Sequence, residues 1–178
     1  WLSQAFLALF YIAIRDDEIF NMIKNGNVSY ELCRPIKINY FWYVKSIANR
    51  LASVLIRFWP ITIVAIFLPA PYNLSAPASI VSGILFIITL ILSLLLVCAI
   101  TTVIHILTFF TYNQIGIISI LFTISALFSG FIVPIPFMPN ALKSLCYILP
   151  FRLTVDLPFR TYSGSISTSE AMISALIQ

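Results

Sequence analysis

The chain has 178 residues, of which 61% are hydrophobic and 9% are charged, and its formal net charge at pH 7 is +4. An average soluble domain carries roughly 25% charged residues, so this composition excludes a soluble catalytic domain and predicts one membrane unit. The basic excess is typical of the lysine and arginine that gather in the cytoplasmic loops of membrane proteins. We therefore expect a lipid membrane, and no nucleic acid, as the partner of this charge.

A long uncharged stretch runs through the middle of the chain. Residues 58–142 contain no Asp, Glu, Lys or Arg, and His105 is the only side chain there that could carry a charge near neutral pH. In a bilayer the backbone must satisfy its own hydrogen bonds, as helices or as a closed barrel. Apolar runs of about 20 residues favour helices. The predicted fold class is all-α: a polytopic helical membrane protein, with residues 1–178 as a single transmembrane domain.

The first predicted element is the end of a span at residues 1–14, because this apolar run is shorter than the roughly 20 residues of a complete span. A cytoplasmic loop at residues 15–46 follows. Its beginning predicts a short helix, since acidic residues at the first turn and a lysine at the last turn complement the helix dipole. These residues are Asp16, Asp17, Glu18 and Lys24, with Asn25 and Gly26 as the stop signal.

The short helix has a small apolar face formed by Ile19, Phe20 and Ile23. This pattern is typical of a helix that lies among the lipid headgroups, and equally of a helix that docks a cytoplasmic partner. The residue pattern alone leaves both interpretations open.

Three complete spans are predicted, at residues 47–68, 78–107 and 114–133. Arg57 lies well inside the first, where a charge is costly unless it reaches water or a partner. It either snorkels or pairs with a neighbouring helix, or it contacts a solute directly. Arg50 lies nearer the cytoplasmic end and is expected to snorkel to the headgroups.

Charge counting predicts the orientation. Residues 15–57 carry seven Lys or Arg and the sequence after the third span carries three, so the first group is assigned to the cytoplasm. Residues 134–165 then lie outside, and their prolines and apolar side chains predict an outer re-entrant segment. Residues 166–178 are predicted to start the last span, with Ser167 and Glu170 as a capping box.

One face of the third span carries only small or hydroxyl side chains, spaced 3, 4, 3 and 4 residues apart: Gly116, Ser119, Thr123, Ala126 and Gly130. Small faces let membrane helices approach closely, and hydroxyl groups can bond across the contact. The face is interpreted as a helix-packing surface or as the lining of a transport pathway. In both cases we expect it to look toward the protein interior.

The chain lacks the residues that catalysis or proton coupling would need. His105 has no acid close to it in sequence, so it is not expected to act as a catalytic base. The three predicted spans contain no Asp or Glu for a proton relay. The cysteines, Cys33, Cys98 and Cys146, are too scattered to predict a disulfide framework or a metal site. We expect no enzyme activity, and an energy source on another polypeptide.

Several short segments follow one another in a characteristic order and spacing. They are residues 26–35, residues 50–52 with Arg57 and Pro60, and residues 69–72, 108–112, 127–134, 149–152 and 158–164. Together they resemble the permease subunit of an ATP-binding-cassette (ABC) exporter of the type-2 (ABC-2) family, and the likeness covers nearly all of the chain from Arg15 onward.

The resemblance implies part of a six-span exporter permease that moves a hydrophobic or amphipathic solute, such as a drug or a lipid, out of the cytoplasm. It implies multidrug-efflux-like export across the plasma membrane, a second or related permease copy, and separate nucleotide-binding ATPase subunits that hold ATP and Mg²⁺, with no cofactor in this chain. The cytoplasmic loop would hold the ATPase-coupling residues: Asp16, Asp17, Glu18, Phe20, Lys24, Tyr30, Glu31 and Arg34. The alternatives are a membrane assembly or anchor protein that moves no solute, and a secondary transporter.

Overall fold

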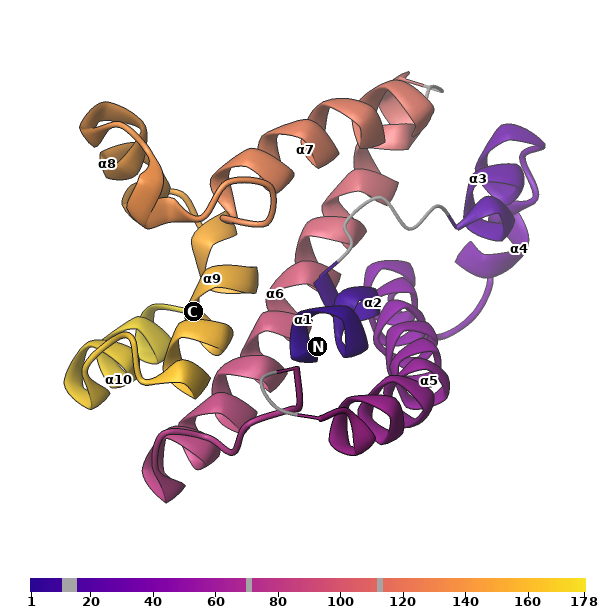
Figure 1. Ribbon diagram of the computed structural model, residues 1–178. Coiled ribbons are helices and arrows are strands. Elements are labelled where there is room, and N and C mark those ends of the chain that lie inside the picture. Colours follow the sequence, from indigo (N-terminus) through magenta and orange to yellow (C-terminus); the bar gives the residue numbers. More distant parts are fainter. Residues whose placement is uncertain (11–15, 70–71, 112–113) are drawn as a thin grey trace.

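The computed structural model describes residues 1–10, 16–69, 72–111 and 114–178 (Figure 1). Every regular element within these ranges is a helix, which confirms the predicted all-α class. The helices are α1 (Leu2–Ala5), α2 (Leu7–Phe10), α3 (Asp17–Lys24), α4 (Val28–Leu32), α5 (Ile38–Phe67), α6 (Ile80–Thr111), α7 (Gln114–Phe128), the 3₁₀ turn η1 (Ile135–Phe137), α8 (Asn140–Ile148), α9 (Phe151–Ser163) and α10 (Thr168–Ile177).

Two helices, α5 and α6, are long and apolar enough to cross a membrane. They contain 30 and 32 residues, and at about 1.5 Å per residue each exceeds the roughly 30 Å of a hydrocarbon core. Helix α5 begins at Ile38, well before the predicted start at residue 47. Trp42 and the aromatic residues on either side of it therefore lie within the first turns of this helix.

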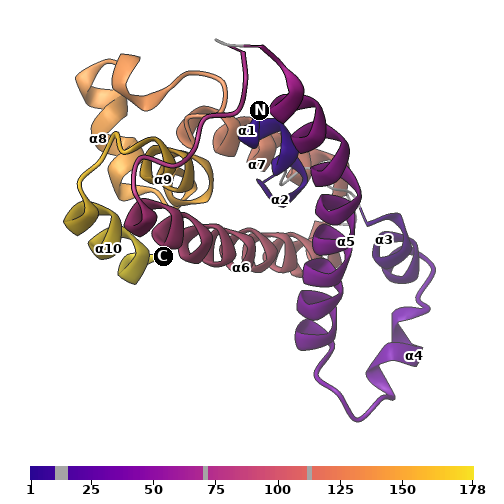
Figure 2. The same ribbon diagram turned by 60° about the horizontal axis from the view of Figure 1, so that its bottom comes forward.

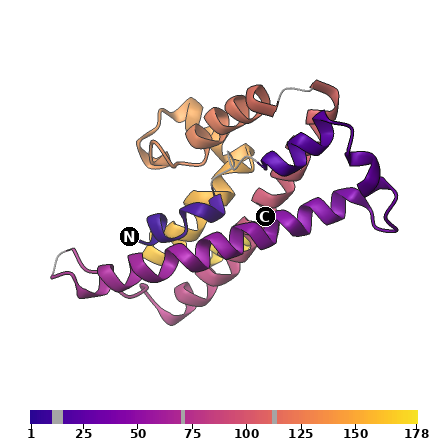
Figure 3. The ribbon, with the colours of Figure 1, turned by 90° about the vertical axis from the view of Figure 1, so that its right-hand side faces the viewer.

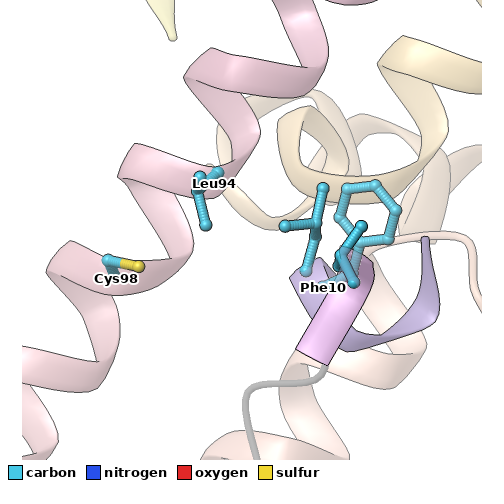
Figure 4. Packing of buried hydrophobic residues seen from close by; sticks show 5 residues of the cluster. Phe10, Leu94 and Cys98 are labelled. Carbon is cyan, nitrogen blue, oxygen red and sulfur yellow. The ribbon is translucent and has the colours of Figure 1, made fainter. Parts of the chain in front are cut away.

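The N-terminal helices lie along α5 (Figure 3). They pack on both long helices through a cluster of buried side chains that contains Phe10 of α2, Val54 of α5, and Leu94 and Cys98 of α6. Figure 4 shows Phe10 beside the α6 helix that carries Leu94 and Cys98. This cluster holds the N-terminal segment against the two long helices.

Helix α6 is the centre of the fold, and it buries a series of hydroxyl side chains. Each of these donates to the carbonyl oxygen four residues earlier, so no hydroxyl is left unsatisfied in an apolar setting: Thr89, Ser93, Thr101, Thr102 and Thr108. Small hydroxyl residues also allow close approach of a second helix. Helix α9 packs along this side of α6, and the Ser93 hydroxyl also donates to the carbonyl oxygen of Leu153 in α9 at 3.0 Å.

The segment after α7 turns back along α6. The beginning of α9 lies beside the middle of α6 at Ser93, and its end lies beside the turn before α6, where the Ala78 amide donates to the Tyr162 carbonyl at 3.2 Å. Helix α8 projects away from this pair (Figure 1). Such a path suits a segment that dips toward the middle of a bilayer and returns, and the re-entrant placement stays a prediction.

Opposite ends of the long helices carry different structures. Helices α3 and α4 lie at one end, and α9 and α10 lie at the other end of α6 (Figure 2). Helix α10 begins as predicted, since the Ser167 hydroxyl accepts from the amide of Glu170 at 3.2 Å. The predicted division into a cytoplasmic and an outer side stays a prediction.

Helix α7 is shorter than the span predicted at residues 114–133. It ends at Phe128 after 15 residues, about 22 Å of helix, which is less than the roughly 30 Å core. Gly130 has a φ of 78°, a left-handed conformation that ends helices, and prolines follow at residues 134 and 136. The sequence prediction was wrong in this respect because it gave the apolar residues after Phe128 to the span.

We expect Gly130→Ala to destabilise the protein by about 1–3 kcal/mol, because an added Cβ is strained at positive φ. It would also lie 3.1 Å from a side-chain carbon of Ile135. The measurement is thermal unfolding of the complete protein in detergent. Gly83→Ala in α6 is the matched control, since its Cβ would make only an ordinary 3.4 Å contact with Pro77. Equal effects of the two substitutions would contradict this explanation of the end of α7.

Candidate functional site

The short helix α3 forms where the charge pattern predicts it. The Asp16 carboxylate accepts a hydrogen bond from the Ile19 amide at 3.1 Å, which satisfies one of the free amides at the helix beginning. Asp17 and Glu18 occupy the first turn and Lys24 occupies the last turn. The predicted helix is confirmed.

The apolar face of α3 is used within the chain. Ile19 and Ile23 are buried against Trp42 of α5, and Phe109 of α6 stacks on Trp42 with ring centroids 5.7 Å apart. The α3 helix is therefore fastened to the two long helices at this end. Ile19 and Ile23 are therefore not available to lipid or to another protein, whereas Phe20 of the same face stays half-buried.

Lys45 of α5 connects α3 to the long helix by charge. Its Nζ atom lies 2.7 Å from a Glu18 carboxylate oxygen and 3.6 Å from one of Asp16. The Lys45 side chain is 20% exposed, against 71% for Glu18. Two of the predicted coupling residues are thus engaged with α5, in addition to any role toward a partner.

The rest of the loop presents charge and apolar area to the outside. Glu31 and Arg34 form an ion pair with 3.3 Å between N and O, and the Arg34 guanidinium lies over the Phe41 ring. Tyr30 of α4 is 75% exposed. Leu32 is also exposed, so large apolar side chains stand free of the chain's own core here.

The remaining predicted coupling residues differ in burial. Phe20 is half-buried, whereas Asp17 and Lys24 are exposed. The structure therefore brings together Asp16, Glu18 and Lys45, whereas Tyr30 stands exposed on α4. Assignment of these residues to ATPase coupling stays a prediction.

Arg50 of α5 carries a buried charge near these helices, and its position differs from the prediction. The side chain is 1% exposed. Its guanidinium donates to the carbonyl oxygens of Ala8 and Leu9 at 3.3 and 3.2 Å, and to the Thr101 hydroxyl at 2.9 Å. The expected snorkelling was wrong because α2 and α6 supply acceptors that the sequence alone could not place beside α5.

A small polar pocket adjoins Arg50 and the beginning of α3. It has a volume of about 20 Å³ and is lined by Asp16, Ser46, Asn49, Arg50, Thr101 and His105. That volume admits about one water molecule. His105 is buried, its ring lies at 81° to that of Trp42, and its Nδ1 atom has no hydrogen-bond partner among the described residues. The pocket places this histidine among polar side chains of α5 and α6 beside the beginning of α3.

Arg57 lies on the chain's surface. Its Nε atom donates to the carbonyl oxygen of Gln4 at 3.0 Å, and the side chain is otherwise exposed. The contact with α1 supports a role in holding the N-terminal segment. A direct contact with a solute stays open, as the sequence left it.

The small face of α7 is only partly covered within one chain. Ala126 is buried and Gly116 and Gly130 are half-buried, whereas Ser119 and Thr123 are exposed. The α7 hydroxyl that is buried instead is that of Ser125, which was not singled out from the sequence. Ser129, just beyond the helix, is buried as well. A packing or pathway role for the five-residue face stays a prediction.

Helices α5 and α6 have the length and composition that the spans of a helical membrane protein need. The chain belongs to the ABC-2 type transporter family, whose model matches residues 5–160. It is accordingly a transport permease component that partners with ABC ATPase subunits, as the resemblance implied. Searches of curated proteins and of solved structures found no match.

We expect Arg50→Met to destabilise the protein by about 3 kcal/mol, since it leaves buried carbonyl groups and the Thr101 hydroxyl without their charged donor. Arg57→Met is the matched control and should cost less than about 1 kcal/mol, because Arg57 is exposed. Both are measured by thermal unfolding of the detergent-solubilised protein. An equal loss for the two variants would show that burial of Arg50 does not stabilise the fold.

Proposed function

We propose that the chain is the membrane-spanning permease subunit of an ATP-driven exporter in the plasma membrane. It moves a hydrophobic or amphipathic solute out of the cytoplasm and works as a pair of permease copies. Separate ATPase subunits bind ATP and Mg²⁺ and hydrolyse ATP. Family membership supports the permease role, and the geometry of the α3 region supports the way in which force reaches the spans.

The observation that carries the proposal is the attachment of α3 to both long helices. Ile19 and Ile23 pack on Trp42, and Lys45 binds Glu18 and Asp16. A helix held by apolar packing and by charge moves together with the elements that hold it. Displacement of α3 by an ATPase subunit would therefore displace the adjoining ends of α5 and α6.

Arg50 extends this connection to the N-terminal segment. It lies on α5 a little more than one turn beyond Lys45, and it binds the carbonyl oxygens of α2 and the Thr101 hydroxyl of α6. The three elements around Arg50 are thus tied to one side chain. We propose that they move as one unit when α3 is pushed.

The exposed surface of α4 is the proposed contact for the ATPase subunit. Tyr30 offers a large aromatic side chain that is 75% exposed, and aromatic residues are frequent anchors of protein interfaces. Arg34 and Lys24 add charge nearby in the same loop. Asp16 and Glu18 would contribute indirectly, by holding α3 against Lys45 of α5.

The test uses the full-length permease reconstituted with its ATPase subunits in lipid vesicles. Tyr30→Ala should weaken ATPase binding about tenfold and lower the vanadate-sensitive ATPase activity of the complex, because an interface anchor is lost. Tyr72→Ala is the matched control, since Tyr72 is also largely exposed, at 67%, but lies in the turn between α5 and α6 at the other end. It should leave both quantities unchanged.

Unchanged ATPase binding in Tyr30→Ala, together with unchanged activity in Asp17→Ala and Phe20→Ala, would contradict coupling through this loop. An assembly or anchor protein would bind its partner without any effect on ATP hydrolysis. A secondary transporter would move solute without the ATPase subunits. The same reconstituted system therefore distinguishes all three functions.

A further inference from the structure

A second site lies at the other end of the fold, between α1, the turn after α7, and α9. It is a half-open cleft of about 400 Å³, within the range of about 300–1,000 Å³ that is usual for small-molecule sites. Gly130 forms part of its wall with a backbone that only glycine adopts readily. The cleft involves none of the predicted coupling residues.

Two opposite charges from α9 face this cleft. Asp156 and Arg160 line it, and an Arg160 guanidinium nitrogen lies 3.5 Å from an Asp156 carboxylate oxygen. The Asp156 side chain is only 9% exposed and that of Arg160 only 24%. Removing both ions from water is costly, and charges inside membrane proteins usually serve a function. The pair therefore presents a buried dipole to whatever enters the cleft.

The other charged group of α9 does not contribute to the cleft. Arg152 is buried elsewhere, over the Tyr147 ring and 4.0 Å from a Glu170 carboxylate oxygen. The charges that line the cleft are thus one acid and one base, which sum to zero. A ligand that complements them carries one positive and one negative group.

The rest of the wall combines apolar and aromatic side chains with three polar ones, Ser3, Gln4 and Ser163. Phe131, Val155 and Phe159 line the cleft beside the ion pair. Phe131 and Val155 also line a smaller chamber further in, toward Phe10 and Phe122. Aromatic faces attract quaternary ammonium groups, and aliphatic surface favours hydrocarbon. The cleft therefore combines a dipolar end with an apolar end.

We propose that this cleft binds one amphipathic molecule with a zwitterionic headgroup that contains a phosphate and an ammonium group. The ammonium group is held at Asp156, the phosphate at Arg160, and the hydrocarbon part against Phe131 and Phe159. This inference rests on the proposed export function, because it names the class of solute that the permease would export.

The test measures binding to the full-length permease with its ATPase subunits in phosphatidylglycerol nanodiscs, without nucleotide. Three fluorescent amphipaths of equal chain length are compared, with phosphocholine, phosphate or trimethylammonium headgroups. The phosphocholine probe should bind at least tenfold more tightly than the other two. Asp156→Asn should weaken binding of the phosphocholine and trimethylammonium probes about tenfold, and Arg160→Gln that of the phosphocholine and phosphate probes.

A further pair of variants tests the site without altering its charges. Ser163 lines the mouth of the cleft and is exposed, so Ser163→Trp should obstruct entry and lower the affinity of the phosphocholine probe about tenfold. Ser163→Ala leaves the cleft open and should have no effect. Thermal unfolding verifies that each variant is folded, and Asp156→Glu should retain affinity if the charge is what matters.

Equal affinities of the three probes would overturn the inference, as would unchanged binding in Ser163→Trp. A photoreactive side chain at position 163 that cross-links to a second protein chain, and not to the probe, would overturn it as well. Stimulation of ATPase activity by the permease is measured separately and needs no ligand. The inference and the proposed function can therefore fail independently.

Discussion

The buried guanidinium of Arg50 determines how α2, α5 and α6 meet. A charge removed from water is stable only where several acceptors surround it, and here the acceptors come from α2 and α6. This requirement fixes the N-terminal segment against α5 and α6, beside the cluster around Leu94. The apolar packing of that cluster stabilises the contact but is non-directional. The hydrogen bonds of Arg50 are directional, so they specify where the N-terminal segment lies.

The two ends of α6 are built by different physical means, in keeping with different tasks. At one end, Ile19, Ile23 and the ion pairs of Lys45 attach α3 to the long helices, so that a displacement of α3 would displace them too. At the other end, α9 packs closely along the hydroxyl side of α6 and leaves a cleft lined by Asp156 and Arg160. A long rigid helix joins the two regions. In this account energy enters at the first end and the solute is recognised at the second.

Much of the fold could be predicted from the sequence, because the signals for it are local. The apolar runs predict α5 and α6, the acids at Asp16 and Asp17 predict the beginning of α3, and Ser167 with Glu170 predicts that of α10. Arg50 could not be placed, since its acceptors at Leu9 and Thr101 are distant in sequence. The early end of α7 was missed because the left-handed backbone at Gly130 leaves no mark on hydropathy.

The candidate sites show the same division. Charge and spacing could identify α3 as a helix, but not the fact that its apolar face is covered by Trp42. Asp156 and Arg160 are four residues apart on a helix, and this spacing could have predicted their ion pair from the sequence. The cleft that it faces needs α1 beside α9, and only the three-dimensional arrangement shows it.

The central claim is that movement of α3 reaches the rest of the spans through Arg50. It is tested most directly by electron–electron spin distances between labels at Asn21 on α3 and Thr123 on α7, both exposed, in the complex with its ATPase subunits. Trapping with ATP and vanadate should shift this distance distribution in the otherwise native protein. In folded Arg50→Met complexes that still bind ATPase, the shift should be lost, and an unchanged shift there would contradict the account.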